Sequence, residues 1–219
     1  MNPRLWLGLG LCGAGLFFAG VYLQLPLLCL LAKPLPVLAL IGWLQFSADT
    51  LLRRPIQLGL AVSLAGDILL AWPGDLFLAG LCAFFFAHLI YLHGFTRDCR
   101  RPAWIALGIA GALAGGMYGL LFLGGLGDLE LPVLVYSLAI AAMLWRALAR
   151  PAEGGLARRS VWLGALGALL FVISDSLIGF DRFLLPIPDA DYPILASYWL
   201  GQWGIAAAAR FAQPTREFG

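Results

Sequence analysis

Charged side chains are scarce in this chain: aspartate, glutamate, lysine and arginine together make up 12% of its 219 residues. A soluble domain carries about a quarter charged residues, so this scarcity excludes a water-soluble fold. Hydrophobic residues make up 62% of the chain, and its apolar runs are long enough to cross a bilayer. The sequence therefore predicts an all-α, polytopic integral membrane protein.

Several kinds of functional motif are also missing. Histidine occurs twice, without H-x-x-x-H or H-E-x-x-H spacing, so we expect no metal site and no cofactor. The four cysteines contain no C-x-x-C pair and are interpreted as small apolar packing residues. No basic stripe interleaved with aromatic residues occurs, which argues against nucleic acid as a partner. Neither G-x-S-x-G nor a glycine-rich phosphate loop is present, so we expect no serine-nucleophile elbow and no nucleotide site.

Apolar windows of about 20 residues predict eight membrane helices. They cover residues 5–23, 26–46, 56–72, 75–95, 103–123, 131–149, 160–180 and 193–211. The connections are short, so residues 1–219 are predicted to form a single eight-helix transmembrane domain. Glycines in the first and fifth segments are interpreted as sites of close helix packing in lipid. They are Gly8, Gly10, Gly13, Gly15, Gly108, Gly111, Gly115 and Gly116.

The basic residues predict the orientation of this bundle. With eight helices, most of them fall on the side of the two termini. These are Arg4, Arg53, Arg54, Arg97, Arg100, Arg101, Arg146, Arg150, Arg158, Arg159, Arg210 and Arg216. Arg182 lies on the other side, and Lys33 lies within the second segment. By the positive-inside rule both termini are predicted to be cytoplasmic, and a helical bundle suits a bacterial inner membrane rather than an outer one.

Two aspartates stand alone inside apolar segments. Asp67 lies in LAVSLAGDILLAW, and Asp175 lies in GALLFVISDSLIGF. A carboxyl group at membrane depth is costly, so such residues face a protein interior or a cavity and mark functional sites. The other acidic residues fall near segment ends or in connections. Asp67 and Asp175 are therefore the candidate site.

Polar side chains from other segments are predicted to converge on the two aspartates. With a rise of about 1.5 Å per residue, most of them fall in one layer of the non-cytoplasmic half. They are Lys33, Tyr136, Tyr198 and Gln202, with His88 nearer the midplane. Tyr91 joins them because Phe84, His88, Tyr91 and Phe95 lie on one stripe of their helix. This layer predicts the floor and walls of a pocket.

Three serines accompany the aspartates. Ser63 shares a helix face with Asp67, and Ser174 and Ser176 flank Asp175. Each hydroxyl could hydrogen-bond a carboxyl group or its own helix backbone.

Other interpretations of the polar residues stay open. Asp67 and Lys33 could form a structural ion pair, and His88 could be a packing histidine. From another functional class, a proton-coupled transporter or lipid binder would use the two aspartates as a proton relay. Such transporters contain paired broken helices, and Pro34 and Pro36 could mark one break, although the sixth segment offers no partner.

Several motifs, taken in order along the chain, carry a family resemblance. They are KPLPVL (33–38), GDILL (66–70), GLCAFFFAHLIYLHGF (80–95), VYSLAIAAM (135–143), GALLFVISDSLIGFDRF (167–183) and SYWLGQ (197–202). On these motifs the chain resembles the YhhN family of membrane lysoplasmalogenases, which have eight membrane helices. The H-x-x-Y of His88 and Tyr91 and the FVISDS run are the most specific.

The resemblance implies hydrolysis of the vinyl-ether bond of lysoplasmalogens, giving a fatty aldehyde and glycerophosphoethanolamine or glycerophosphocholine. It implies that Asp67 and Asp175 are the catalytic acids. It also implies a set of substrate-binding or supporting residues, namely Lys33, His88, Tyr91, Tyr136, Ser174, Ser176, Tyr198 and Gln202. The expected partners are the lysophospholipid substrate and the surrounding membrane lipids.

The chemistry of a vinyl ether agrees with two carboxyl groups in one site. Its β-carbon must be protonated, and water must then attack the resulting oxocarbenium ion. Glycosidases solve a related problem with one protonated and one ionised carboxyl group. Because Asp67 is nearer Lys33 in sequence, our hypothesis is that Asp67 is the ionised base and Asp175 the protonated acid.

Overall fold

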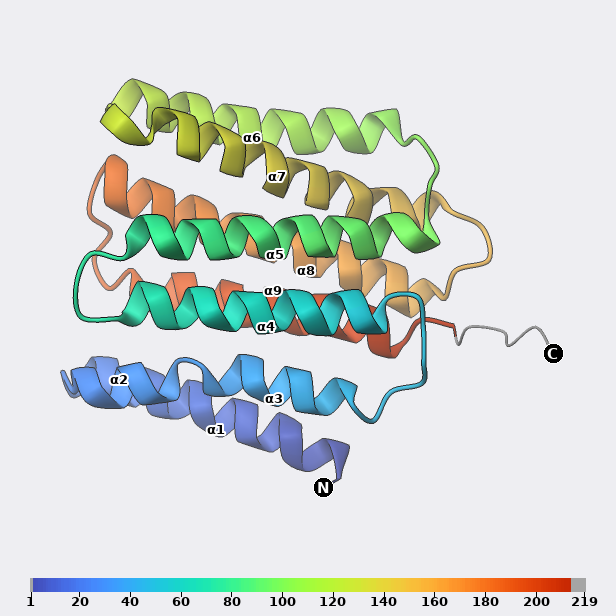
Figure 1. Cartoon of the computed structure of the whole chain (residues 1–219), viewed down its shortest axis with the longest axis horizontal. Helices are drawn as coiled ribbons and strands as arrows, with labels where there is room; N and C mark the ends of the chain where they lie inside the picture. The colour runs from blue at the N-terminus through green and yellow to red at the C-terminus, as the bar shows by residue number, and fades with distance from the viewer. Residues whose placement is uncertain (1, 214–219) are drawn as a thin grey trace.

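The computed structural model describes residues 2–213, and within that range the secondary structure is helical, with no strand (Figure 1). The helices are α1 (Pro3–Tyr22), α2 (Pro26–Ala32), α3 (Leu35–Leu44), α4 (Arg53–Ala71), α5 (Phe77–Asp98), α6 (Trp104–Gly124), α7 (Glu130–Ala149), α8 (Arg158–Phe183) and α9 (Asp191–Arg210). Short 3-10 turns, η1 (Gly127–Leu129) and η2 (Arg150–Ala152), flank α7. The predicted all-α class is confirmed.

The second predicted segment, 26–46, is interrupted where α2 meets α3. Pro34 and Pro36 have no amide hydrogen, so carbonyls one turn before them lose their helical donors. The α2 coil still continues up to the junction, because Lys33 N donates to Cys29 O at 3.0 Å. The break predicted from the two prolines is confirmed, and it places Lys33 at the junction of the two helices.

Seven helical segments within residues 2–213 are long and apolar enough to cross a membrane. The helix predicted as the eighth span, α9, has 20 residues but falls outside this set. Its surroundings give a physical reason: Ile205 and the alanines at 206–209 are fully buried by neighbouring helices. A helix that contacts mainly protein needs less apolar surface toward lipid.

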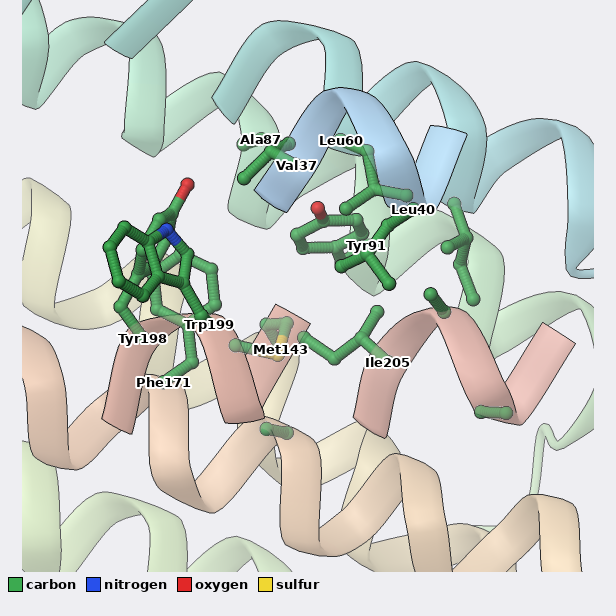
Figure 2. Close-up of a cluster of buried hydrophobic side chains, with 14 of the residues drawn as sticks. Val37, Leu40, Leu60, Ala87, Tyr91, Met143, Phe171, Tyr198, Trp199 and Ile205 are labelled. Atoms are coloured by element: carbon green, nitrogen blue, oxygen red, sulfur yellow. The ribbon is translucent and has the colours of Figure 1, made fainter. Parts of the chain in front are cut away.

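Five helices enclose the core of the bundle. α8 packs on α9, α4 packs on α5, and contacts of α5 and α8 with α7 and of α4 with α9 close the group. α1, α2 and α3 flank this group on the α4 and α9 side, and α6 flanks it next to α7 (Figure 1). The buried side chains at the centre include Tyr91, Met143, Phe171, Tyr198 and Ile205 (Figure 2).

Backbone contact between α8 and α9 depends on glycine. A Cβ atom on Gly167 would lie 2.6 Å from Ile205 N, and one on Gly204 would lie 2.7 Å from Gly167 Cα. No side chain fits at such distances, so only glycine allows the two backbones to approach this closely. The approach fixes α9, which carries Tyr198 and Gln202, against α8, which carries Asp175.

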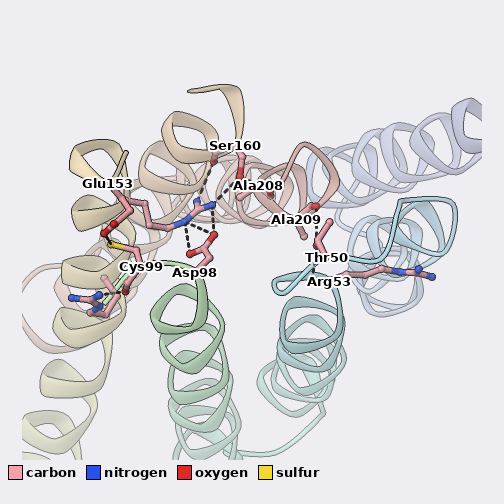
Figure 3. A network of polar contacts seen from close by, with 10 residues as sticks. Thr50, Arg53, Asp98, Cys99, Glu153, Ser160, Ala208 and Ala209 are labelled. Atoms are coloured by element: carbon pink, nitrogen blue, oxygen red, sulfur yellow. Dashed lines mark hydrogen bonds and ion pairs between the residues drawn. The ribbon is translucent and has the colours of Figure 1, made fainter. Parts of the chain in front are cut away.

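A polar network fastens the end of the bundle where α5 and α7 end and α8 begins (Figure 3). Arg150 is fully buried; its Nη2 lies 2.9 Å from Asp98 Oδ2 and 2.8 Å from Ser160 Oγ, and its Nη1 donates to Ser160 O at 3.2 Å. Ser160 Oγ in turn donates to Ala208 O at 2.7 Å. The network therefore joins α5, η2, α8 and α9.

Arginine dominates this end of the molecule. Arg101 donates to Ala152 O at 3.0 Å, Arg146 donates to the backbone of Cys99 and Arg101, and Arg210 donates to Trp43 O at 3.1 Å. Arg216 lies outside the described residues. Lys33 and Arg182 lie at the opposite end, so the clustering predicted from the sequence is observed for the described arginines, and we call this the basic end.

The cysteines are free thiols in the described part of the chain. Cys99 is buried, and its Sγ donates to Glu153 Oε2 at 3.3 Å. Burial, together with this hydrogen bond, raises the pKa of the Cys99 thiol. A raised pKa keeps the thiol neutral and poorly reactive, in agreement with a packing role.

The interpretation of the α6 glycines is wrong within this chain. A Cβ atom on Gly108, Gly111, Gly115 or Gly116 would meet no atom within 4 Å, because that face of α6 points away from the bundle. Among the α1 glycines, Gly10 and Gly13 do contact α3, whereas Gly8 and Gly15 are open. A small-residue stripe permits close packing but does not fix which face meets a neighbour.

Candidate active site

A polar cavity of about 200 Å³ opens at the end of the bundle opposite the basic end. Its polar wall residues come from helices far apart in the sequence: Lys33, Asp67, Ser174, Asp175, Asp181, Arg182, Asp191 and Tyr198. Both candidate aspartates therefore face one cavity, as the sequence predicts. Asp67 is 2% exposed, whereas Asp175 is partly exposed.

A chain of hydrogen bonds ends on Asp67. Tyr198 Oη donates to Asp67 Oδ2 at 2.8 Å, and Gln202 Nε2 donates to Tyr198 Oη at 3.1 Å. On the far side, Tyr91 Oη donates to Gln202 Oε1 at 2.8 Å and lies 3.4 Å from Ser63 Oγ. The bonds from Gln202 and Tyr198 point toward Asp67, so Asp67 Oδ2 acts as a hydrogen-bond acceptor at the end of the chain of hydrogen bonds.

The Tyr91 hydroxyl can join this chain of hydrogen bonds because α4 has a glycine, Gly59, beside the Tyr91 ring. A Cβ atom on Gly59 would lie 2.2 Å from the Tyr91 ring, so the ring occupies the volume that any other residue at position 59 would fill. Tyr91 is fully buried, and its hydroxyl is oriented by packing as well as by hydrogen bonds.

A second cluster surrounds Asp175. Tyr136 Oη donates to Asp175 Oδ2, and His88 Nε2 lies 2.9 Å from Tyr136 Oη and 3.3 Å from Asp175 Oδ2. Among the described residues, nothing hydrogen-bonds to His88 Nδ1, which is buried. A hydrogen on Nδ1 would be buried without an acceptor, so the neutral tautomer with its hydrogen on Nε2 is favoured.

Two phenylalanines separate the clusters. The Phe171 ring centroid lies 4.8 Å from that of His88 and 5.3 Å from that of Tyr198, and Phe84 lies 5.7 Å from Tyr198. These rings exclude water from the space behind the two carboxyl groups. The groups thus share a cavity but have separate hydrogen-bond partners.

A smaller apolar cavity, of about 80 Å³, adjoins the polar one between α5, α6, α7 and α8. Tyr136 and Asp175 are on its wall, and its apolar lining includes Met117, Leu121 and Ile140. The two cavities share Asp175 as well as Leu70, Phe77, Phe84 and Ile178. Asp175 therefore lies where a polar space meets an apolar one.

The structure brings all the predicted site residues together in two roles. Lining residues are Lys33, Asp67, Tyr136, Ser174, Asp175, Ser176 and Tyr198. Residues behind the wall, which hold lining side chains by hydrogen bonds or packing, are His88, Tyr91 and Gln202.

Two partner arrangements that the sequence left open are not observed. Ser174 Oγ donates to Ile194 O of α9 at 2.9 Å, and Ser63 Oγ lies 3.4 Å from Tyr91 Oη, so in the part of the chain that the structure describes these two serines bond neither to a carboxyl group nor to their own helix backbone. Within the described residues, no ion pair joins Lys33 to Asp67, although both side chains line the polar cavity. The break after α2 holds Lys33 on the cavity wall without bringing it onto the carboxylate.

Several lining residues escaped the sequence analysis. Asp181, Arg182 and Asp191 line the polar cavity, although their positions near helix ends resemble those of ordinary solvated charges. One signal was present: Arg182 and Lys33 are the basic residues that do not join the others at the basic end. The apolar lining from α6, such as Met117, had no distinguishing signal.

This arrangement can perform acid–base chemistry on a molecule that is polar at one end and apolar at the other. Both carboxyl groups accept a hydrogen bond through Oδ2: Asp67 accepts from Tyr198 in a buried position, and Asp175 accepts from Tyr136, beside His88, at the junction of the two cavities. Two carboxyl groups in different environments can divide proton donation and water activation between them.

Residues 28–209 match the family model described as the YhhN family. Lysoplasmalogenase TMEM86B of Sus scrofa is 39% identical over 173 residues, which cover 78% of this chain and 71% of that protein. The Homo sapiens TMEM86B is 38% identical over 188 residues, covering 85% and 77%. A lysoplasmalogenase of Mycobacterium tuberculosis is 34% identical over 169 residues, covering 74% and 62%. No solved structure matches the chain.

Proposed function

Since the chain belongs to the YhhN family, we propose that it is a lysoplasmalogenase, an ether hydrolase that acts within the membrane. Its substrate is a lysoplasmalogen, in which a vinyl ether joins a long alkenyl chain to a glycerophosphoethanolamine or glycerophosphocholine head group. Water cleaves that bond and leaves a fatty aldehyde and the free glycerophospho-alcohol.

One observation carries the proposal: Asp175 lies at the junction of a polar and an apolar cavity. In a lysoplasmalogen the vinyl ether is likewise the junction between the polar and apolar parts. With the alkenyl chain along Met117, Leu121 and Ile140 and the head group in the polar cavity, the reactive bond falls beside Asp175. Asp67 then faces the same bond from the polar side.

The proposed reaction begins with proton transfer from the Asp175 carboxyl group to the β-carbon of the vinyl ether. The resulting oxocarbenium ion is attacked at its α-carbon by a water molecule whose proton passes to Asp67. The hemiacetal then collapses: its hydroxyl proton passes to Asp175, the bond between its carbon and the glycerol oxygen breaks as Asp67 gives its proton to that oxygen, and the aldehyde departs, which restores both carboxyl groups.

The residues around the two aspartates hold each carboxyl group in the position that the reaction requires. His88 and Tyr136 hold the Asp175 carboxyl group at the junction through Oδ2, which leaves its other oxygen to act on substrate. Tyr198 and Gln202 hold Asp67 as an acceptor. Ser174 ties α8 to the α9 backbone and so keeps the two acidic sites in register.

The membrane arrangement is part of the proposal. α9 is the eighth span, residues 1–219 form one domain, and both termini are cytoplasmic in a bacterial inner membrane. The arginines gathered at the basic end support this orientation, since they lie at the end where α1 begins and α9 ends. The polar cavity then opens on the non-cytoplasmic side.

Aldehyde release tests the reaction. Purified protein in a maltoside detergent is given an alkenyl lysophosphoethanolamine, and Asp175→Asn is compared with Asp128→Asn, an exposed aspartate at the same end of the bundle that lines neither cavity. We expect release by the wild type and by Asp128→Asn, and loss of about a hundredfold or more in Asp175→Asn. A folded wild type that releases no aldehyde from either head-group class rejects the proposal.

The rival function, a proton-coupled transporter, has less support. Only one of the two breaks expected of such a fold is seen in the described residues, because α7 runs without interruption from Glu130 to Ala149. A transporter would also give lipid movement driven by a pH gradient in vesicles, without a chemical product.

A further inference from the structure

Charged side chains of both signs surround the polar cavity. Lys33, Asp181, Arg182 and Asp191 all line it, and they come from the α2–α3 junction, the end of α8 and the start of α9. We call these four residues the charged rim. The mechanism assigns none of them a role.

The two cations of the rim depart from the pattern of the chain. Lys33 is its one lysine, and Lys33 and Arg182 are the basic residues at the end opposite the basic end. Lys33 is half-buried, held by the proline break, and has no ion-pair partner among the described residues. A half-buried ammonium group on a cavity wall, with no ion-pair partner of its own in the described chain, is suited to bind an anion that enters the cavity.

The Arg182 side chain is held in place by an ion pair and a ring contact, but its guanidinium group stays accessible to a ligand. Its Nη2 lies 3.1 Å from Asp75 Oδ2, and its guanidinium carbon lies 3.9 Å from the Phe77 ring centroid. The side chains of Arg182 and Asp75 are 39% and 75% exposed, and such exposed pairs contribute little to stability. A ligand phosphate can therefore take the place of Asp75 at little cost.

The spacing along α8 relates Arg182 to the reactive bond. Asp175 and Arg182 are seven residues apart, so they share a helix face about 10 Å apart along the axis. The guanidinium group lies over the ring of Phe77, which lines both cavities together with Asp175. A glycerol backbone, which separates the vinyl ether from the phosphate, bridges the remaining gap.

The acidic members of the rim lie in the last turn of α8 and at the start of α9. Asp181 is held in place because its Oδ1 accepts a hydrogen bond from Ile187 N at 2.7 Å, which leaves Oδ2 available. Asp191 is exposed in the first turn of α9. These carboxylates can attract a cation that projects beyond a phosphate bound to Lys33 and Arg182.

We propose that the charged rim is a head-group site that reads the zwitterion of its lipid substrate, with Lys33 and Arg182 binding the phosphate and Asp181 and Asp191 the ammonium group. The inference rests on the proposed function, because it assumes that the substrate is a glycerophospholipid. It adds a recognition site to the catalytic one and explains why charges of both signs line the cavity.

Direct binding tests the rim separately from catalysis. A fluorescent saturated-ether lysolipid, which lacks the reactive double bond, is bound to full-length protein in maltoside detergent. It is displaced by saturated-ether lysophosphoethanolamine, by saturated-ether lysophosphatidate, which lacks the amine, and by alkylglycerol, which lacks both charges. The three competitors divide binding into chain, phosphate and amine contributions.

Lys33→Gln and Arg182→Gln are expected to raise the Kd of both phosphate-bearing lipids about tenfold and to leave alkylglycerol within about twofold. Asp181→Asn with Asp191→Asn is expected to raise the Kd of the phosphoethanolamine lipid about fivefold and to leave lysophosphatidate unchanged or tighter. Arg54→Gln and Asp128→Asn, which change exposed residues outside both cavities, should alter none of these values.

Two results would overturn the proposal: unchanged affinity for the phosphate-bearing lipids in the Lys33 and Arg182 variants, or an equal loss for alkylglycerol, which would indicate local distortion. Failure of the proposed function gives a different signature. In that case the wild type releases no aldehyde, whatever the displacement experiment shows.

Discussion

The two ends of the bundle use charge in opposite ways. At the basic end, the buried guanidinium group of Arg150 donates from Nε, Nη1 and Nη2 to Asp98 and Ser160, so its hydrogen-bonding capacity is met within the chain. At the other end, Asp67, Asp175 and the charged rim face a cavity. A buried charge whose partners are all internal stabilises the fold, whereas charges that line a cavity remain available to a ligand. The same residue types are thus structural at one end and chemical at the other.

The largest effect is expected from Asp67→Asn, which keeps the shape of the side chain and removes its basicity. We expect kcat for aldehyde release to fall about a thousandfold, equivalent to about 4 kcal/mol in the barrier. Thermal stability should stay the same or rise, because a buried carboxyl group without an ion pair is costly. A kcat near the wild-type value would show that Asp67 takes no part in the reaction, and the contrast between the two ends of the bundle would then be wrong.

Arg150→Gln should produce the reverse pattern. The change leaves the Asp98 carboxylate mostly buried without its cation, and such losses cost about 3 kcal/mol or more of unfolding free energy. Thermal unfolding in detergent measures this loss of stability. The matched control is Arg97→Gln, which changes an exposed arginine in the last turn of α5. Activity per folded molecule should be retained; a selective loss of kcat in folded Arg150→Gln protein would place this network in catalysis.

Tyr198→Phe tests the directed hydrogen bonds on Asp67. It removes one hydroxyl group that donates to Asp67 and accepts from Gln202. We expect kcat to fall about tenfold with little change in KM, because a hydrogen bond to a charged group contributes about 1.5 kcal/mol or more. A change confined to KM would assign Tyr198 to substrate binding instead.

The smallest effect concerns the ion pair between Asp75 and Arg182. Asp75→Asn frees the guanidinium group for substrate, and because the pair is exposed, KM should fall by about twofold or less. Steady-state kinetics with the phosphoethanolamine substrate measures this change. A severalfold rise in KM would instead show that Asp75 holds Arg182 in its binding position.

Most of the fold could be predicted because lipid imposes long apolar runs, and prolines and glycines mark their ends. The predicted segment 160–180 corresponds to α8, and the break at Pro34 follows from the missing amide hydrogen. The direction in which a helix faces is less predictable: the α6 glycines are spaced for helix contact, yet that face meets nothing in the described chain.

The site was predictable to the extent that burial makes a residue unusual. Asp67 and Asp175 stand out because carboxyl groups are rare in apolar segments, and Tyr136 and His88 follow from depth and periodicity. Arg182 could not be identified in this way, since a charge near a helix end is ordinary until the fold places it on a cavity. The partner of Ser174, a backbone carbonyl on another helix, depends on the packing of α8 against α9.

The burial of α9 has a consequence for how the helices of the bundle assemble into a complete active site. α9 falls outside the set of helices that are long and apolar enough to cross a membrane, and it is held by backbone contact at Gly167 and by Ser174, so its position depends on the helices it packs against. It also brings Tyr198 to Asp67. Without α9 the Asp67 carboxyl group lacks the hydroxyl that donates to it, so the site is complete only when α9 is docked against α8.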